Sequence, residues 1–148
     1  NTQTIQSFVI TSLYTKNWLI KTFKKINLKK SKLSKVAVLG LAYKENTNSI
    51  KNSPSLDLLE RIKDKAVHIH DPVVDPNKIK YGTYFKSIDE CIRNVDVLII
   101  STPWEEYKKI DLNKLKNKMN GNVIIDPFRV LNSKLLIDLG FQYHTLGI

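Results

Sequence analysis

Short apolar clusters recur along the chain in two spacings, one typical of buried strands and one typical of helices. Residues 36–39 (Val36–Leu39) and 97–100 (Val97–Ile100) are uninterrupted apolar runs. A similar run, Val123–Asp126, is apolar up to its last residue. Such runs are typical of parallel strands that are covered on both faces. Leucine and isoleucine at helical spacing separate them. The pattern predicts strands alternating with helices, and therefore an α/β fold with a doubly wound, mostly parallel, Rossmann-like sheet.

The segments between these strands carry recognisable helix starts and stops. Ser53 or Asn52 can cap a helix that has Pro54 in its first turn. Gly121 and Gly140 each follow a helical pattern, as expected where a helix ends. The other predicted elements are two strands and three helices: Val67–His70, Phe141–Leu146, Ser87–Arg93, Leu112–Met119 and Ser133–Leu139.

Residues 1–28 form a separate pattern at the front of the chain. They contain no glycine or proline, and their apolar residues fall at helical spacing: Ile5, Phe8, Val9, Leu13, Ile20 and Phe23. We predict one long helix, followed by the polar stretch Lys29–Lys35. A domain of this size does not need so long a leading helix, so its apolar stripe is expected to support association with another part or copy of the protein.

The charge is unevenly distributed over the 148 residues, which suffice for one domain with an appendage. The net charge is +10, and no acidic residue precedes Glu45. A basic helix fits a nucleic-acid partner or a merely solvated face; the scarcity of arginine and the lack of a nucleic-acid motif favour no nucleic-acid partner. No apolar run reaches the roughly 18 residues of a membrane span, so no membrane partner is expected. Asn1 begins no signal-peptide pattern, which indicates a cytoplasmic piece of a longer protein.

Two residue types that often carry chemistry are sparse here. Cys91 is the sole cysteine, so an internal disulfide is excluded, and its helical context favours a buried structural thiol over a reactive one. His68 and His70 share one face of a predicted strand. No cysteine or carboxylate cluster completes a metal site around them, so no metal is expected.

The most informative stretch joins the first predicted strand to the helix that begins near Ser53. The strand ends at Gly40, and a polar loop follows, an arrangement that places anions at the carboxyl edge of an α/β sheet. The dinucleotide fingerprint G-x-G-x-x-G is absent, because Ala42 stands at the second glycine position. Asp71, at the end of the second strand, is only weak support for a ribose-binding acid. The loop therefore predicts a phosphate ligand other than NAD.

Three side chains at this edge suit a nucleoside diphosphate. Lys44 and Arg129 supply positive donors for phosphate oxygens, and Tyr43 is placed to stack on a base. Each has a plainer interpretation: Lys44 as a solvated loop lysine, Arg129 as an ion-pair partner of Asp126 or Asp138, and Tyr43 as a cover for the sheet edge. Trp104 is expected to pack under a loop. No nucleophilic triad or paired catalytic carboxylates occur, which favours a binding domain.

Four ordered motifs and a Ser-Pro helix start, spread over the whole chain, resemble those of one enzyme family. They are Gly40–Thr47 (similar to G-x-A-[FY]-K-x-[DN]-T), Ser53-Pro54, Asp71-Pro72, Thr102–Tyr107 (similar to T-x-W-x-[DE]-[FY]) and Asp126–Leu131 (similar to a D-x-R segment). On these residues the chain resembles the C-terminal, UDP-binding domain of the UDP-glucose/GDP-mannose dehydrogenase family. It departs from the family pattern at Lys51-Asn52, which replaces Arg-Glu, and at Phe128, which leaves Arg129 as the guanidinium of its segment.

The resemblance implies an organisation and an activity. Residues 1–34 correspond to the end of a central dimerisation helix and a linker, and residues 35–148 to the UDP-binding domain. Enzymes of this family oxidise C6 of a nucleotide sugar twice with NAD, which is bound mainly by an N-terminal domain, and with a cysteine in a G-x-C-[FL]-P segment. This chain lacks that segment, and Cys91 does not match it. We therefore expect no catalytic residue, no bound cofactor and no activity in this chain alone.

The resemblance also implies a ligand and a partner. Lys44 would hold the phosphate or sugar region, Tyr43 would line the uridine diphosphate site, and Arg129 would lie close to the substrate. The expected substrate is UDP-glucose, oxidised to UDP-glucuronate, and the expected assembly is a homodimer through the central helix. Two alternatives stay open: a UDP-N-acetylhexosamine 6-dehydrogenase of the same family, and a non-catalytic nucleotide-binding or interaction module that uses the basic helix.

Overall fold

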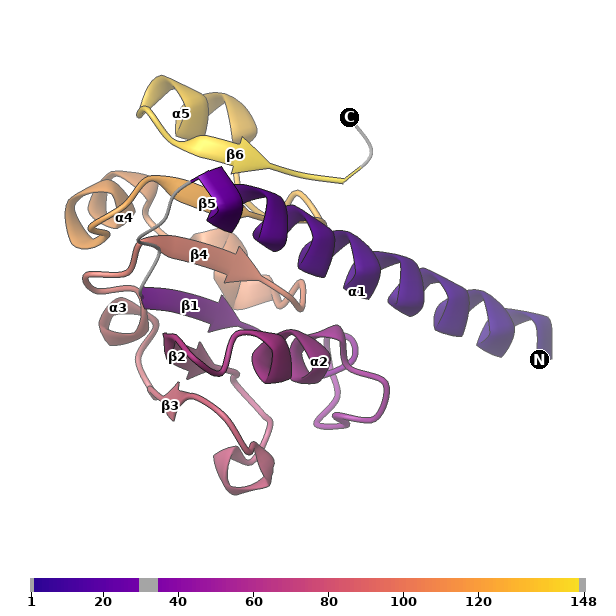
Figure 1. Ribbon diagram of the computed structural model, residues 1–148. Helices are drawn as coiled ribbons and strands as arrows, with labels where there is room; N and C mark the ends of the chain where they lie inside the picture. The colour runs from indigo at the N-terminus through magenta and orange to yellow at the C-terminus, as the bar shows by residue number, and fades with distance from the viewer. Residues whose placement is uncertain (1, 30–34, 147–148) are drawn as a thin grey trace.

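The computed structural model describes residues 2–29 and 35–146, with the side chains of the first range described over residues 13–26. Six parallel strands form one sheet in the order β3-β2-β1-β4-β5-β6 (Figure 1). The strands are β1 (Lys35–Leu39), β2 (Ala66–His70), β3 (Thr83–Tyr84), β4 (Val97–Ile100), β5 (Val123–Ile125) and β6 (Gln142–His144). This order is that of a Rossmann-like, doubly wound fold, as the sequence predicts.

Helices connect the strands and begin where the sequence places capping residues. They are α1 (Thr2–Lys29), α2 (Pro54–Arg61), α3 (Ile88–Cys91), α4 (Leu112–Lys118) and α5 (Ser133–Asp138), with two 3-10 turns, η1 (Pro76–Lys78) and η2 (Glu105–Lys109). Ser53 caps α2: its hydroxyl accepts a hydrogen bond from the backbone N–H of Ser55. None of the helices within residues 2–29 and 35–146 combines the length and apolarity that crossing a bilayer requires.

The predicted elements are confirmed in type and order, but one strand is shorter than predicted and three short elements were not predicted. Phe141–Leu146 is shorter than predicted, since only Gln142–His144 pair with β5. The two-residue strand β3 and the turns η1 and η2 were not predicted. These elements are too short for a periodic pattern, and β3 exists because His68 and Ile69 of β2 give it a partner.

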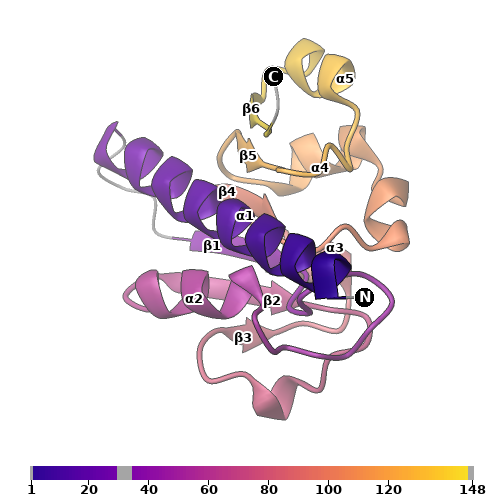
Figure 2. The ribbon, with the colours of Figure 1, turned by 90° about the vertical axis from the view of Figure 1, so that its right-hand side faces the viewer.

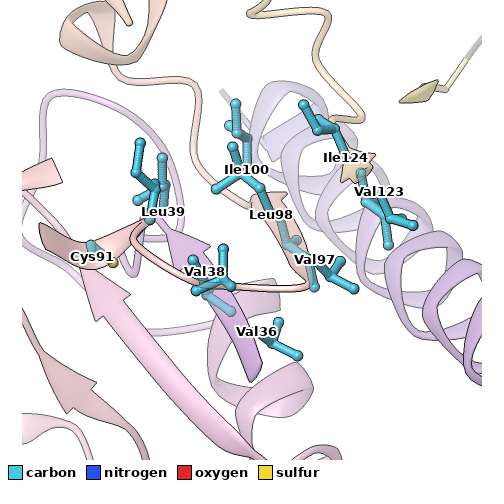
Figure 3. Packing of buried hydrophobic residues seen from close by; sticks show 14 of the residues in the cluster. Val36, Val38, Leu39, Cys91, Val97, Leu98, Ile100, Val123 and Ile124 are labelled. Atoms are coloured by element: carbon cyan, nitrogen blue, oxygen red, sulfur yellow. The ribbon is translucent and has the colours of Figure 1, made fainter. Parts of the chain in front are cut away.

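The sheet is the middle layer of the domain. α1 and α2 lie together on one face, and α3 and α4 lie on the other (Figures 1 and 2). All four residues of β4 and all three of β5 are buried, which accounts for their uninterrupted apolar sequences. Figure 3 shows Val38, Leu98 and Ile124 from three neighbouring strands in this core.

The long helix α1 is divided along its length. Leu19, Phe23 and Ile26 are buried in the same apolar core as the sheet, whereas Leu13 and Tyr14 are 47% and 63% exposed. The second half of the predicted apolar stripe therefore packs within the chain itself. Ile5, Phe8 and Val9 have side chains outside the described range, so their expected role in association stays a prediction.

Candidate functional site

The candidate site lies at the carboxyl edge of the sheet, where the strand order changes direction. β1 pairs with β2 on one side and with β4 on the other. Ligands of doubly wound sheets bind outside the carboxyl ends of the strands at such a switch point. Tyr43 and Lys44 follow β1 at this edge, Trp104 follows β4, and Arg129 follows β5.

Gly40 makes the first turn of the β1 loop, where no other residue would fit. Its φ is +100°, and a Cβ at this position would lie 2.4 Å from Cβ of Thr102. The loop after β1 and the loop after β4 therefore touch at backbone level. This close approach places the start of the β1 loop directly against the switch point.

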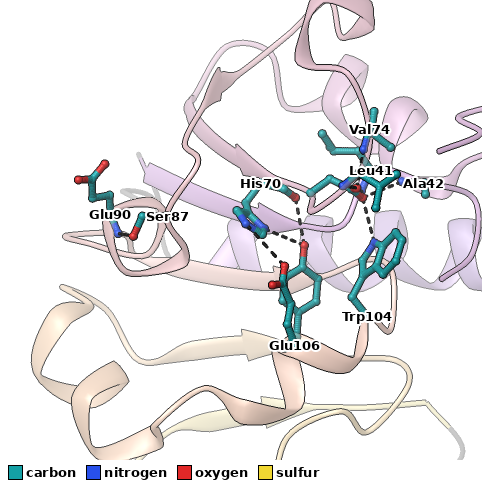
Figure 4. Close-up of polar contacts among 11 residues, drawn as sticks. Leu41, Ala42, His70, Val74, Ser87, Glu90, Trp104 and Glu106 are labelled. Atoms are coloured by element: carbon teal, nitrogen blue, oxygen red, sulfur yellow. Dashed lines mark hydrogen bonds and ion pairs between the residues drawn. The ribbon is translucent and has the colours of Figure 1, made fainter. Parts of the chain in front are cut away.

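Asp71 accepts the polar contacts that hold this loop, and Figure 4 labels four of the donor residues, Leu41, Ala42, Val74 and Trp104. The side chain of Asp71 is 1% exposed. Oδ2 accepts hydrogen bonds from the backbone N–H groups of Leu41 (2.7 Å) and Ala42 (3.2 Å) and from Nε1–H of Trp104 (3.0 Å). Oδ1 accepts from the N–H groups of Val73 and Val74, both at 2.9 Å. Five donors thus surround one carboxylate, so Asp71 is a structural acceptor rather than a ribose-binding acid.

Three side-chain hydroxyls donate hydrogen bonds to the backbone carbonyls of Gly40, Leu41 and Ala42. Ser55 donates to the carbonyl of Gly40 (2.6 Å), Ser53 to that of Leu41 (2.7 Å) and Thr102 to that of Ala42 (2.8 Å). The N–H of Gly40 donates to the carbonyl of His70 at 2.8 Å. Every backbone polar group from Gly40 to Ala42 therefore has a fixed partner within the chain.

Tyr43 and Lys44 are the first residues beyond this fixed tripeptide. Tyr43 is half-buried, Lys44 is exposed, and Nζ of Lys44 lies 5.5 Å from the centre of the Tyr43 ring. The structure thus brings these two predicted site residues together. Arg129 lies on the same edge, with β4 between its strand and β1, which corresponds to about 10 Å across the sheet.

Arg129 has an unusual backbone conformation. Its φ is +53°, and the other described non-glycine residues with positive φ are Asn46, Asn52 and Asn94. Asparagine tolerates this left-handed region, whereas arginine is strained there by about 1–2 kcal/mol. An exposed residue held in a strained conformation is a sign of functional constraint.

A second buried carboxylate, Asp126, supports the loop that carries Arg129. Asp126 is 0% exposed, and its Oδ2 accepts from the N–H of Leu131 (2.9 Å) and from the hydroxyl of Tyr143 (2.7 Å). Burial and the neighbouring Asp126 raise the pKa of Tyr143 well above its usual range. Oδ1 of Asp126 is buried and has no hydrogen-bond partner among the described residues.

The two histidines of β2 have structural partners. His70 is 4% exposed, and its Nδ1 lies 2.9 Å from the hydroxyl of Tyr107, which donates to the carbonyl of His70 at 3.2 Å. Burial lowers the pKa of His70, against the opposing charges of Glu106 and Asp71. Nδ1 of His68 lies 2.9 Å from the carbonyl of Cys91. Within residues 2–29 and 35–146, no group of three His, Cys, Asp or Glu side chains is placed to hold a metal ion.

Cys91 is a structural residue, as predicted. Its side chain is 0% exposed, and burial raises the pKa of its thiol to about 12. Trp104 also lies where predicted: it is 7% exposed and packs under the β1 loop, where it donates to Asp71.

The two larger hollows beside the basic helix lie away from the predicted residues. One of about 410 Å³ lies beside the start of α2 and is lined by Lys16 of α1 and by Ser53. Another of about 830 Å³ lies between α1 and β6 and is lined by Trp18, Lys21 and Lys25. Tyr43, Lys44 and Arg129 line neither of them.

Sequence reasoning placed Asp71 and Thr102 at this edge but missed Ser55 and the hydrogen bonds through which all three residues shape the loop. Their donors and acceptors are 15 to 60 residues away along the chain. The local signal for the role of Asp71 is the Asp-Pro pair at the end of β2. An aspartate directly after a buried strand is costly to bury and therefore needs hydrogen-bond donors.

Taken together, the fold and the edge define a Rossmann-like α/β domain without a dinucleotide loop. Residues 37–133 match the family described as "UDP-glucose/GDP-mannose dehydrogenase family, UDP binding domain". The chain belongs to this family of nucleotide-sugar dehydrogenases.

Relatives agree with this assignment. The chain is 29% identical over 119 residues to a UDP-glucose 6-dehydrogenase of Rickettsia prowazekii, covering 76% of this chain and 27% of that protein. The UDP-glucose 6-dehydrogenase TuaD of Bacillus subtilis is also 29% identical, with 76% and 26% covered. The chain therefore spans about a quarter of the length of these relatives.

Solved structures share the fold. A UDP-D-ManNAc dehydrogenase of Pyrococcus horikoshii superimposes with a TM-score of 0.69 at 28% identity, covering 91% of this chain and 30% of that one. An NDP-N-acetyl-D-galactosaminuronic acid dehydrogenase of Methanosarcina mazei gives a TM-score of 0.74 at 23% identity, covering 93% and 29%, and supports the fold alone.

Proposed function

We propose that residues 35–148 bind the diphosphate and nucleoside of a UDP-sugar and that residues 1–34 belong to a preceding helical domain. In this proposal Lys44 binds phosphate oxygens, Tyr43 lines the uridine diphosphate site, and Arg129 approaches the substrate from the loop after β5. The observation that carries it is the carboxyl edge itself. Two exposed cations follow β1 and β5, while the backbone groups that would hold a dinucleotide are already occupied.

The activity we propose is that of a whole nucleotide-sugar 6-dehydrogenase, of which this chain is a part. UDP-glucose is the proposed substrate, oxidised at C6 to UDP-glucuronate, with NAD bound mainly by a domain outside this chain. The UDP-glucose 6-dehydrogenases among the relatives support this choice. Cys91 is buried, so we propose no catalytic role for it and no activity for residues 1–148 alone.

A UDP-N-acetylhexosamine is the second candidate substrate. The Pyrococcus horikoshii structure, named a UDP-D-ManNAc dehydrogenase, is 28% identical to this chain, close to the 29% of the Rickettsia prowazekii UDP-glucose enzyme. Comparing UDP-glucose with UDP-N-acetylmannosamine as substrates of the full-length enzyme separates the two candidates.

A homodimer through α1 and a cytoplasmic location complete the proposal. The exposed Leu13 and Tyr14 support an interface on the first half of this helix. Sedimentation of the chain with Leu13→Lys tests it: the substitution should shift a dimer toward monomer. A monomeric parent chain would contradict the proposed interface.

Calorimetry with UDP tests the site. Lys44→Ala removes one charge-assisted hydrogen bond, which contributes about 1.5–3 kcal/mol, so UDP should bind about ten- to a hundredfold more weakly. Added salt should weaken the parent chain more than the variant. The parent chain should also bind UDP more tightly than NAD.

Lys25→Ala, on the exposed side of α1, is the matched control and should leave UDP affinity unchanged. Equal small losses of UDP affinity in both variants would show that the positive charge attracts UDP only through a long-range electrostatic field. That result would contradict the site and favour the rival function, a module that binds polyanions through α1.

A further inference from the structure

The loop after β1 begins with a glycine turn at the switch point, and the first N–H groups beyond this turn point at Asp71. Leu41 and Ala42 are the residues whose N–H groups follow the turn at Gly40. In dinucleotide-binding folds, the groups at this turn contact the pyrophosphate. Here one carboxylate oxygen accepts both, at 2.7 Å and 3.2 Å.

Asp71 is itself held from the side away from the loop. Val73 and Val74 donate to Oδ1, and the indole N–H of Trp104 joins the loop donors on Oδ2. Asp71 is 1% exposed and therefore shielded from solvent, and its carboxylate occupies the acceptor position at the Leu41 and Ala42 amides that a phosphate oxygen would need.

We propose that Asp71 is a specificity-determining residue: a permanent internal anion that excludes ligand phosphate from the Leu41 and Ala42 amides and shifts phosphate recognition outward to Lys44. The inference deepens the proposed function and rests on it only for the class of ligand, a diphosphate. A dinucleotide is rejected because its pyrophosphate would meet a like charge where it needs donors.

The contact chemistry predicts what Asp71→Asn does. The neutral amide removes the like charge, and an amide oxygen is a weaker acceptor than a carboxylate for the N–H groups of Leu41 and Ala42, so these groups become easier for an external anion to contact. Inorganic pyrophosphate should then bind about tenfold or more tightly than it binds the parent chain, as expected for one gained hydrogen bond to a charged group.

The test is an NMR titration of the 148-residue chain with inorganic pyrophosphate and, separately, with UDP. In the parent chain the amide signals of Leu41 and Ala42 should stay in place at saturation while those near Lys44 shift. In Asp71→Asn the Leu41 and Ala42 signals should respond to pyrophosphate. Asp75→Asn is the matched control, since Asp75 is an exposed carboxylate that caps η1 four residues away, and it should behave as the parent chain.

Trp104→Phe distinguishes the effect of the Asp71 charge from the effect of losing a hydrogen bond that holds the loop. It removes one donor to Oδ2 and keeps the carboxylate, so a merely structural role predicts that it resembles Asp71→Asn, whereas the proposal predicts no response to pyrophosphate. Direct shifts of the Leu41 and Ala42 amides in the parent chain, or unchanged pyrophosphate affinity in Asp71→Asn, would overturn the proposal.

If Asp71→Asn does not fold, the parent chain and Trp104→Phe decide. Unshifted, exchange-protected amides at Leu41 and Ala42 support the proposal, and shifted ones overturn it. If UDP fails to bind the parent chain, the proposed function fails, while the pyrophosphate comparison still decides the role of Asp71.

Discussion

Two buried carboxylates stand at the same edge of the sheet and are satisfied to different extents. Asp71, after β2, accepts five hydrogen bonds divided over both oxygens. Asp126, after β5, accepts two on Oδ2, and its Oδ1 has no partner among the described residues. Native proteins rarely leave such a buried atom unpaired. The two loops therefore differ in whether the hydrogen-bonding capacity of their buried carboxylate is filled by the described residues.

The β5 loop also has the more strained backbone of the two. The β1 loop turns at Gly40, whose positive φ carries no strain, while the β5 loop places Arg129 in the left-handed region. The first loop is preorganised before any ligand arrives. The second retains strain and an unsatisfied oxygen, features that concentrate where a structure is constrained by binding.

The largest expected effect comes from exchanging each carboxylate for its amide. In Asp71→Asn at least two of the five donors lose their acceptor, and each loss costs about 1–3 kcal/mol, so stability should fall by roughly 3 kcal/mol or more. Asp126→Asn can place its amide oxygen where Oδ2 was and should lose only about 1 kcal/mol. Urea unfolding of both variants measures the difference, and equal losses would contradict the contrast.

Arg129→Gly should change stability and binding in opposite directions. Glycine removes the left-handed strain, which stabilises the fold by about 1 kcal/mol, while loss of the guanidinium weakens UDP binding about tenfold. Asn46→Gly, at φ +63° in the β1 loop, is the control and should leave both quantities nearly unchanged. Thermal unfolding and calorimetry provide the two values. A loss of stability in Arg129→Gly would show that Arg129 supports the fold rather than the ligand.

A smaller effect concerns pH. Burial lowers the pKa of His70 below its ordinary 6.5, so the unfolded chain binds a proton that the folded chain resists. Stability should therefore be complete above pH 6.5 and should decline as the pH falls below it toward the folded pKa. Glu106→Gln removes the charge that opposes this shift and should deepen the decline. Urea midpoints between pH 7.5 and 5 test this, and a flat profile would exclude His70 as the cause.

The smallest effect is expected at Cys91. Cys91→Ser should change UDP affinity by less than about twofold, because the Cys91 side chain is buried in α3, away from the loops that carry Tyr43, Lys44 and Arg129. A thiol whose pKa is about 12 should also react slowly with iodoacetamide at pH 8 and rapidly in urea. Fast labelling of the folded chain would contradict its burial.

Much of the fold followed from local pattern, whereas the support of the site did not. Val97–Ile100 and the Ser53 cap identify their own elements because the cause lies within a few residues. Asp71 gave only an Asp-Pro strand end, since its partners Leu41 and Trp104 become neighbours only when β1, β2 and β4 align. The left-handed φ of Arg129 had no local signal, because arginine does not favour that conformation.

The attachment of Asp71 to the chain has a thermodynamic consequence for the β1 loop. A free anion occupies its site in proportion to its concentration, whereas an anion carried on the same polypeptide has a fixed effective concentration that no dilution lowers. The Leu41 and Ala42 amides therefore stay saturated at every substrate level. We therefore expect the loop backbone to keep the same form with and without ligand, and we expect the ordering entropy of the proposed binding to fall on the side chains of Tyr43 and Lys44.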